Sequence, residues 1–263
     1  MSRIASAFSE WAAEAALGHL SARHVDAEAS ISLDAVTLLA PLNPGARIFA
    51  TGRNYADHLL RLGASIPASP SAFIMPDSAI IGDAADIAYP PTTNELDYEI
   101  ELVAVMAKPL MAGASATSSV LGYTIGNDVS ARDAMRIAGG RSDLFSQKAC
   151  DGATPVGPWI ATLDEFGGPG QPEVALRLSV NGEERQSDNT KSMLFSVDRC
   201  LDYVDDRIAL RAGDLVFTGT THGVGMESGR FLQPGDVVEA QIDKIGALRN
   251  RVGNKMRSRR FTA

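Results

Sequence analysis

The sequence predicts an α+β fold with a predominantly β body. After residue 45 the chain is dominated by short apolar runs of about strand length, most of them bounded by Gly, Pro, Asn or Asp. Asn181-Gly182, directly after an alternating apolar run, is the strongest hairpin signal in the chain. Helical patterns are few and do not alternate regularly with the strands, which disfavours a doubly wound sheet.

The first 45 residues are predicted to form a small N-terminal cap. Apolar residues over positions 5–20 follow helical spacing. A stretch with Ile31, Leu33, Val36 and Leu38 is spaced like a short strand and is closed by a Pro and Gly cluster at 41–45. We therefore expect two parts, a cap over residues 1–45 and a main domain over residues 46–263.

The main domain is predicted to be built from strands, with two helices. Six apolar runs predict strands over residues 48–50, 72–75, 100–106, 174–180, 215–218 and 237–242, and a further strand is expected over 120–125. Helices are expected over residues 133–138 and 196–203.

Charge and composition exclude several classes of function. The chain has 24 Lys and Arg against 32 Asp and Glu, a formal net charge of −8, so no overall basic field is available to hold a nucleic acid. No apolar stretch is long enough for a membrane span, and the acidic residues near the start do not fit a signal peptide, so we expect a cytoplasmic protein. Cys150 and Cys200 lack metal or redox spacing and are interpreted as small buried hydrophobes.

The most informative segment is Glu95-Leu-Asp-Tyr-Glu-Ile-Glu101, in which every odd position is acidic. In a strand, alternate side chains share a face, and neighbours on that face lie about 7 Å apart at Cα. A solvated strand face is the alternative interpretation. The apolar residues that follow Glu101 place Glu99 and Glu101 beside a buried segment, which favours a hard divalent cation, Mg²⁺ or Mn²⁺.

Asp128 is the best candidate for a third carboxylate ligand. It follows the strand expected over 120–125 and lies in a polar turn, where ligands on a rigid scaffold are often found. The alternative is an ordinary turn at Asn127-Asp128, with Ser130 or Asp133 capping a helix.

Seven short motifs, taken in order, resemble the fumarylacetoacetate hydrolase family. They are GRNYADH at 52–58, YEIEL at 98–102, GNDVSARD at 126–133, Lys148 ahead of TPVGP at 154–158, VNGE at 180–183, NTKSM at 189–193 and GDLVFTGT at 213–220. Each is weak alone, but seven in the right order are hard to obtain by chance. The resemblance runs from about residue 46 to 252.

The resemblance implies a mixed β-roll catalytic domain, β-sandwich-like and usually homodimeric, with an Mg²⁺ or Mn²⁺ site. The family's ligand positions fall on Glu99, Glu101 and Asp128. Its members act on small β-dicarbonyl or 2-oxo dicarboxylate compounds, which they hydrolyse at a C–C bond, decarboxylate or isomerise. No nucleotide-binding fingerprint is present, so no nucleotide cofactor is implied.

The resemblance also assigns roles to other residues. His58 matches the general base and Lys148 the catalytic lysine, which would neutralise or protonate an enolate. Positions expected to bind the substrate are Arg53, Tyr55, Arg132, Thr190, Ser192 and Thr220.

Three positions near the chemistry depart from the family pattern. Arg61 stands where hydrolytic members have a Glu three residues after the His, Met75 replaces a Lys before Pro, and Met135 replaces a substrate-facing Gln. A histidine without a carboxylate partner is a poorer base, so Arg61 puts water activation in question.

The leading hypothesis is a metal-dependent hydrolase that cleaves a C–C bond in an acylpyruvate-like acid. An isomerase or decarboxylase at the same site needs no activated water and is the first alternative. A non-catalytic protein that binds the metal and a ligand is the second.

Overall fold

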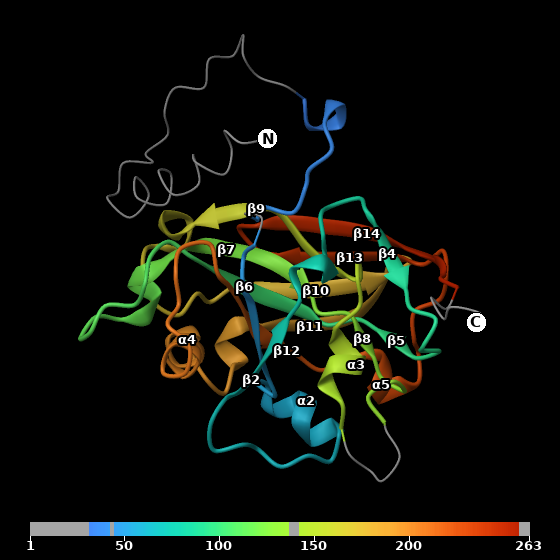
Figure 1. Ribbon diagram of the computed structural model, residues 1–263, viewed down its shortest axis with the longest axis horizontal. Coiled ribbons are helices and arrows are strands. Elements are labelled where there is room, and N and C mark those ends of the chain that lie inside the picture. Colours follow the sequence, from blue (N-terminus) through green and yellow to red (C-terminus); the bar gives the residue numbers. More distant parts are fainter. Residues whose placement is uncertain (1–31, 43–44, 137–141, 258–263) are drawn as a thin grey trace, which may run out of the picture.

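The computed structural model describes residues 32–42, 45–136 and 142–257. Strands dominate this part of the chain, and the helices are short (Figure 1). The predicted α+β class with a mainly β body is therefore confirmed. The helix expected over residues 5–20 lies outside the described residues, and the division at residue 45 stays a prediction.

A seven-stranded mixed sheet forms the centre of the molecule. Its strands, in spatial order, are β2 (Ser71–Met75), β1 (Ile48–Gly52), β12 (Leu215–Thr220), β6 (Ile100–Met106), β7 (Val120–Asn127), β9 (Thr154–Thr162) and β3 (Ile80–Ile81). The β1–β12 and β3–β9 pairs are parallel and the others antiparallel. The central strand pair, β6 and β7, supports the carboxylates described below.

A second sheet of five strands packs against the first. It contains β11 (Glu183–Asn189), β10 (Ala175–Val180), β13 (Val237–Ile242), β14 (Gly246–Lys255) and β4 (Asp86–Tyr89), in this order. A two-stranded ribbon joins β5 (Leu96–Asp97) to β8 (Ser130–Ala131).

The buried strand β6 separates two apolar clusters. Leu102, Ala104 and Met106 pack in the larger cluster with side chains of the five-stranded sheet. Val103 and Val105 face the opposite way and pack with residues of β1 and β12. Burial on both faces explains why the β6 sequence is apolar at almost every position after Glu101.

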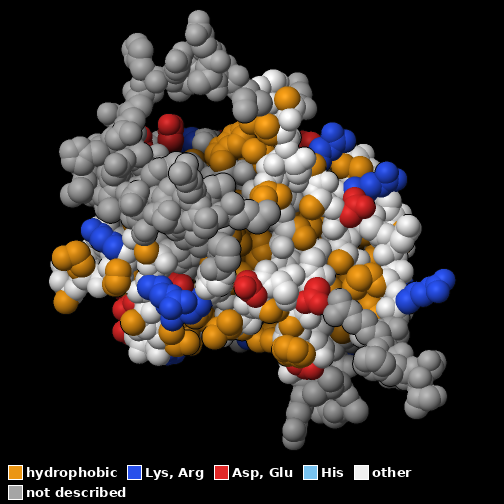
Figure 2. Space-filling model, turned by 45° about the horizontal axis from the view of Figure 1, so that its top comes forward, with side chains coloured by type: hydrophobic (Ala, Val, Ile, Leu, Met, Phe, Trp, Pro, Cys, Tyr) orange, Lys and Arg blue, Asp and Glu red, His pale blue; other side chains and the backbone are white. Residues whose placement is uncertain are grey.

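The helices are short and lie at the strand ends. They are α2 (Ala56–Arg61), α3 (Leu144–Lys148), α4 (Val197–Asp205) and α5 (Gly225–Ser228), with 3-10 turns at η2 (Leu33–Ala35), η3 (Asp77–Ala79), η4 (Ala116–Ser119), η5 (Leu163–Phe166) and η6 (Thr190–Ser192). Within the described residues, no helix is both long and apolar enough to cross a membrane. On the face shown in Figure 2, acidic, basic and apolar side chains are interspersed, without a continuous basic patch in its described part.

All seven strands expected after residue 45 are confirmed. Two of them, β6 and β13, have the expected bounds. Asn181 and Gly182 join β10 to β11 with φ angles of 53° and 80°, the positive values that favour Asn-Gly in a two-residue hairpin. The expected helix over 196–203 is α4, for which the Ser196 side chain accepts a hydrogen bond from the Arg199 N–H.

Two local expectations are wrong. Leu33 lies in a 3-10 turn, and no strand includes Val36 or Leu38. The helix expected over residues 133–138 is a hydrogen-bonded turn in its described part, residues 133–136, and Arg136 forms a bridge with Ser142; positions 137 and 138 lie outside the described residues. The Asp133 carboxylate caps the N–H groups of Asn94 and Ala134, so its local hydrogen bonds stabilise a turn rather than a helix.

The acidic segment is not one continuous strand. Its pairing stops after Asp97 and resumes at Ile100, so Glu95 and Asp97 do not share one continuous strand face with Glu101. Glu95 pairs with Arg136, and Asp97 pairs with Arg132. The alternative of a solvated face is also wrong, because Asp97, Glu99 and Glu101 are buried.

Candidate active site and metal centre

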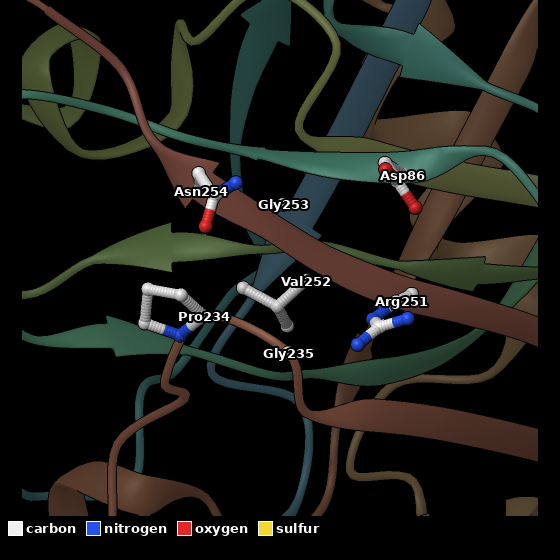
Figure 3. Close-up of a pocket in the computed structure, with 7 residues that line it drawn as sticks. All are labelled: Asp86, Pro234, Gly235, Arg251, Val252, Gly253 and Asn254. Carbon is white, nitrogen blue, oxygen red and sulfur yellow. The ribbon is translucent and has the colours of Figure 1, made fainter.

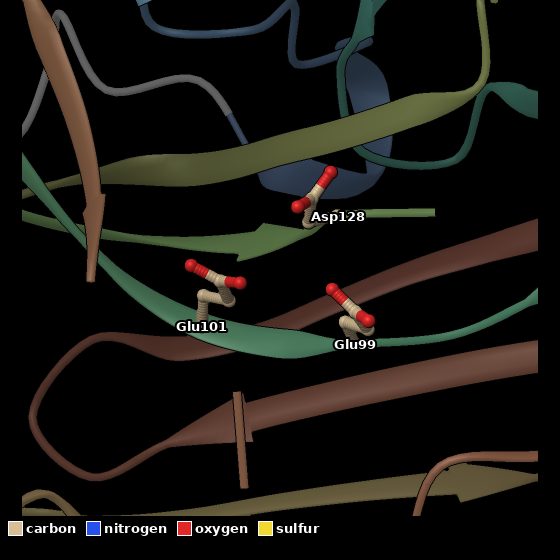
Figure 4. Close-up of side chains that lie close together, drawn as sticks. All are labelled: Glu99, Glu101 and Asp128. Carbon is tan, nitrogen blue, oxygen red and sulfur yellow. The ribbon is translucent and has the colours of Figure 1, made fainter. Parts of the chain in front are cut away.

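Three buried carboxylates meet at the ends of β6 and β7. Oxygen atoms of Glu99, Glu101 and Asp128 all lie within 4.8 Å of one another. Glu101 pairs with Gly126 across the two strands, which brings Asp128, just past the end of β7, next to Glu99 (Figure 4). The structure therefore brings together the three residues that the sequence selected as ligands.

Backbone contacts hold these carboxylates in place. The Asp128 N–H donates to the Glu99 carbonyl at 2.9 Å, and the Glu99 N–H donates to the Asn127 side-chain oxygen at 2.9 Å. Gly219 of β12 donates its N–H to Glu101 Oε2 at 2.7 Å. The backbone of Glu99 is thus fixed against Asp128 and Asn127, and the Gly219 N–H fixes the Glu101 carboxylate, which is how a rigid ligand set is built.

Two buried cations contact the carboxylates. Lys148 Nζ lies 2.7 Å from Glu99 Oε2 and 2.5 Å from Asp128 Oδ2. Arg132 donates from Nη2 to Glu99 Oε1 at 2.5 Å and from Nε to Asp97 Oδ2 at 2.8 Å. Burial lowers the pKa of Lys148, but the Asp128 and Glu99 carboxylates outweigh it and raise that pKa overall.

The buried charges fit an additional divalent cation. Glu99, Glu101, Asp128 and Asp97 carry −4 when ionised, and Lys148 and Arg132 carry +2, which leaves −2. Asp128 Oδ1 is buried without a hydrogen-bond partner among the described residues. Burial, then the neighbouring Asp128 and Glu99, raises the pKa of Glu101 well above its usual value, and burial raises that of Asp128 to about 6. Oxygen donors of this kind suit Mg²⁺ or Mn²⁺.

A cavity of about 440 Å³ opens onto the carboxylates. Lys148, Arg132, Gln147 and Thr220 supply polar groups to its wall. The apolar side chains that line it are Leu59, Leu62, Ala64, Phe73, Met135, Leu144 and Met226. Its volume lies within the range typical of small-molecule sites.

His58 faces the same cavity and has a carboxylate partner that the sequence did not reveal. His58 Nδ1 lies 2.8 Å from Glu227 Oε1, and both side chains are about 10% exposed. The expectation that His58 lacks such a partner is therefore wrong. The Glu that hydrolytic members place three residues later is replaced by one from α5, while Arg61 itself is exposed.

Asp97 anchors α5, and sequence reasoning did not assign it this role. Its carboxylate accepts hydrogen bonds from the N–H groups of Gly225 and Met226 at 2.6 and 3.0 Å. It also pairs with Arg132, which contacts Glu99. The helix that carries Glu227 is thereby connected to the carboxylate cluster, and the only signal in the sequence was the acidic alternation itself.

The residues expected to bind substrate divide into two groups. Arg53, Arg132 and Thr220 line the cavity. Tyr55 and Thr190 are buried away from its wall, where Thr190 donates to the Pro172 carbonyl at 2.5 Å, and Ser192 is exposed. Their contacts with a substrate stay predictions.

The structure also shows where the other two departures from the family pattern and the two cysteines lie. Met135 lines the cavity, as a replacement for a substrate-facing residue would, whereas Met75 packs in the apolar cluster beside β1. Cys200 is fully buried and Cys150 is partly exposed, so the interpretation as two buried hydrophobes holds for Cys200 only.

A second hollow lies at the edge of the five-stranded sheet, away from these residues. Its volume is about 500 Å³, and it is lined by Asp86, Pro234, Gly235, Arg251, Val252, Gly253 and Asn254 (Figure 3). It contains one carboxylate and one guanidinium but none of the residues that the sequence predicted for the site.

Comparison with known proteins identifies the family. Residues 47–253 match the model of the fumarylacetoacetate (FAA) hydrolase C-terminal domain. The chain belongs to the fumarylacetoacetate hydrolase family. It is therefore an enzyme of that family, and its mixed β-roll and buried acidic cluster agree with this membership.

Three relatives illustrate the range of reactions in this family. The chain is 35% identical to a mitochondrial oxaloacetate tautomerase of Bos taurus, over 82% of this chain and 69% of that protein. It is similar in structure to 5-carboxymethyl-2-hydroxymuconate delta-isomerase from Mycobacterium smegmatis, with a TM-score of 0.72, 35% identity and coverage of 86% and 83% of the two chains. A fumarylpyruvate hydrolase from Pseudomonas aeruginosa, solved with Mn²⁺ and pyruvate, has a TM-score of 0.70, 32% identity and coverage of 90% and 100%. Together these findings support a metal-dependent enzyme that processes a small acid.

Proposed function

We propose that this enzyme hydrolyses a C–C bond in an acylpyruvate-like 2-oxo or β-diketo acid with Mg²⁺ or Mn²⁺. The observation that carries the proposal is the His58–Glu227 pair. His58 lines the same cavity as the carboxylates and Lys148, and Glu227 contacts its Nδ1. Hydrolysis requires an activated water, and a histidine oriented by a carboxylate is the side-chain arrangement that provides one.

Glu99, Glu101 and Asp128 would hold the cation. A bound divalent ion polarises the carbonyl of a chelating 2-oxo acid and stabilises the charge that develops on its oxygens. The uncompensated −2 of the buried ionised groups and the unpartnered Asp128 oxygen support this assignment.

His58 would act as the general base. Its Nδ1 is held by Glu227, so Nε2 is the nitrogen left to accept a proton from water. Glu227 stabilises the imidazolium that forms, and it is itself fixed by a hydrogen bond of 3.0 Å from the Gly223 N–H. This arrangement is the basis for preferring hydrolysis over reactions that need no water.

Lys148 would supply positive charge to the leaving fragment. When the C–C bond breaks, the fragment that keeps the bonding electrons becomes an enolate. The Lys148 ammonium, held beside Glu99 and Asp128, would neutralise that enolate or protonate its carbon. Arg132 donates from Nε to Asp97 and from Nη2 to Glu99, and it would chiefly orient Glu99.

A tautomerase or isomerase at the same site is the second candidate. Relatives of that kind, from Bos taurus and Mycobacterium smegmatis, share 35% identity with this chain. Such reactions need proton transfer and enolate stabilisation but no activated water. An oxaloacetate decarboxylase at this site has the same requirements. The third reading, a non-catalytic binding protein, loses its main support because His58 has a carboxylate partner.

Glu227→Gln separates these reactions. We expect the variant to lose roughly 10²- to 10⁴-fold in kcat/KM for acylpyruvate hydrolysis, because the neutral amide no longer stabilises the imidazolium. Enol–keto conversion of oxaloacetate and isomerisation of hydroxy-diene dicarboxylates should change little. The exposed Glu173 provides the matched control, Glu173→Gln. Unchanged acylpyruvate hydrolysis in Glu227→Gln, or turnover of the isomerase substrates alone by the parent enzyme, would overturn the proposal.

A further inference from the structure

Gln147 is a buried amide that faces the cavity without a protein partner for its oxygen. It lies in α3, just before Lys148, with a relative exposure of 4%, and it lines the cavity wall. Its Oε1 has no hydrogen-bond partner among the residues that the structure describes. A buried polar group in this state disfavours folding, so its presence calls for a ligand.

The position of Gln147 distinguishes it from the other buried side-chain atoms that lack a hydrogen-bond partner. These other atoms are Tyr55 Oη, Tyr123 Oη, Thr154 Oγ1, Arg185 Nε and Asp128 Oδ1. Of their residues, only Asp128 lines the cavity, and it belongs to the carboxylate cluster. Among the described residues, Gln147 is therefore the unpartnered buried group that faces the cavity and is not one of the proposed cation ligands.

The surroundings of Gln147 indicate what it would bind. Leu144 of the same helix and Met135 also line the cavity and offer no hydrogen bonds of comparable strength. An uncharged amide both donates and accepts, which suits a hydroxyl or carbonyl oxygen. A second carboxylate would be better served by the guanidinium of Arg53, which also lines this cavity.

We propose that Gln147 determines specificity by hydrogen-bonding an uncharged oxygen on the part of the substrate remote from the cation-chelating 2-oxo acid. The inference rests on the proposed function only in that a 2-oxo acid binds at the carboxylate cluster. A buried group that must be paired discriminates strongly against an analogue that lacks its partner. The enzyme therefore selects an oxygenated chain over an alkyl chain of equal length.

Binding of a matched ligand pair tests this selection directly. Calorimetric titration in Mg²⁺ compares 2,5-dioxohexanoate, which has a remote carbonyl, with 2-oxohexanoate, which lacks it. We expect the enzyme to bind the dioxo acid roughly tenfold or more tightly, and we expect Gln147→Met to remove that preference. Oxalate, which has no remote chain, should bind both forms equally. In Glu173→Gln, a control at an exposed residue that does not line the cavity, the preference should survive.

Thermal unfolding separates this specificity role from a structural one. Without ligand, Gln147→Met should raise the Tm, because it replaces an unpartnered amide by an apolar chain of similar length. If Gln147 is instead needed for packing or for an intramolecular hydrogen bond, Gln147→Met should lower the Tm. A lowered Tm together with an equal loss of affinity for all three ligands overturns the proposal.

The remaining outcomes separate this inference from the proposed function. Equal affinity of the parent enzyme for the two hexanoates overturns the specificity role, even if acylpyruvates are hydrolysed. A preference that depends on Gln147 supports that role, even if hydrolysis is not observed and the proposed reaction fails. Absence of oxalate binding in Mg²⁺ would overturn both, because the shared chelating site would then be wrong.

Discussion

Glu101 shows how a single carboxylate couples folding to a cation. It is 2% exposed, and its neighbours within the cluster are two more carboxylates. Burial and the charges of Asp128 and Glu99 raise its pKa well above the usual range, so its ionised form is disfavoured until positive charge is added. Cation binding and folding should therefore reinforce each other.

Glu101→Gln should abolish the stabilisation of the enzyme by Mg²⁺. At a Mg²⁺ concentration of 100 times Kd, the parent should gain about 2.7 kcal/mol of unfolding free energy. The amide cannot contribute a charged ligand, so the Tm of the variant should not rise with Mg²⁺. Glu173→Gln, which changes an exposed glutamate, should respond like the parent. An unchanged Mg²⁺ response in Glu101→Gln would rule out the ligand assignment.

Glu227 should contribute to acid stability in a predictable direction. Burial raises its pKa, but the hydrogen bonds from His58 and the Gly223 N–H outweigh burial and lower the pKa overall. The unfolded chain then binds the proton more readily than the native protein. The contribution is complete above the ordinary glutamate pKa and is lost as the pH falls through the lowered value. We expect this contribution to be less than about 1 kcal/mol, as is usual for a single ion pair.

Urea unfolding of the parent and Glu227→Gln between pH 3 and 6 measures that contribution. The difference in unfolding free energy should be largest at pH 6 and should shrink on acidification. A difference that grows toward pH 3 would contradict the lowered pKa of Glu227.

At the scale of the element, β12 positions the site through one glycine. Gly219 has a φ of +94°, and a Cβ added there would lie 2.8 Å from the Asn54 Cβ. This backbone conformation directs the Gly219 N–H to Glu101 Oε2. The register of β12 with β6 is also interrupted between Phe217 and Thr220, so the strand bends where it contacts the site.

Gly219→Ala should therefore damage both stability and cation binding. A non-glycine residue at this φ, with a close contact, should cost about 1–3 kcal/mol of unfolding free energy. The misplaced N–H should also weaken the Mg²⁺ response measured by the rise in Tm. Gly52→Ala on neighbouring β1, where a Cβ meets nothing within 4 Å, provides the stability control. Equal stability of the two variants would show that the Gly219 conformation is not required.

At the scale of the whole molecule, the site depends on elements far apart in the sequence. The ion pair of His58 with Glu227 joins residues 169 positions apart. Asp97 links β5 to α5 across 128 positions, and Gly219 reaches Glu101 across 118. The packed sheets bring these segments together, so we expect the arrangement of the site residues to be lost only when the sheets unfold.

The assembly is a prediction at this scale, based on the family resemblance. We expect a homodimer, with a mass in sedimentation equilibrium of twice the 27.8 kDa chain. A monomeric mass at micromolar concentration would contradict the expectation. The same measurement with and without Mg²⁺ would show whether the assembly depends on the cation.

The sequence by itself determined the elements whose signals are local. The buried run of β6, the Asn-Gly hairpin and the helix expected over residues 196–203 each follow from a few adjacent residues, and the structure contains all three. Glu99, Glu101 and Asp128 could be selected because strand alternation and a following turn mark them. The turn at Asp133 was missed because its side-chain hydrogen bonds compete with helix formation.

Only the tertiary structure decided which groups act together. Nothing near His58 in the sequence indicates Glu227, and nothing near Gln147 indicates that its oxygen is left without a protein partner. The tertiary structure also shows that Met135 lines the cavity, whereas Met75 packs in the apolar cluster. The physical reason is that side-chain pairing and burial depend on contacts between strands and helices distant in sequence, which local residue patterns do not encode.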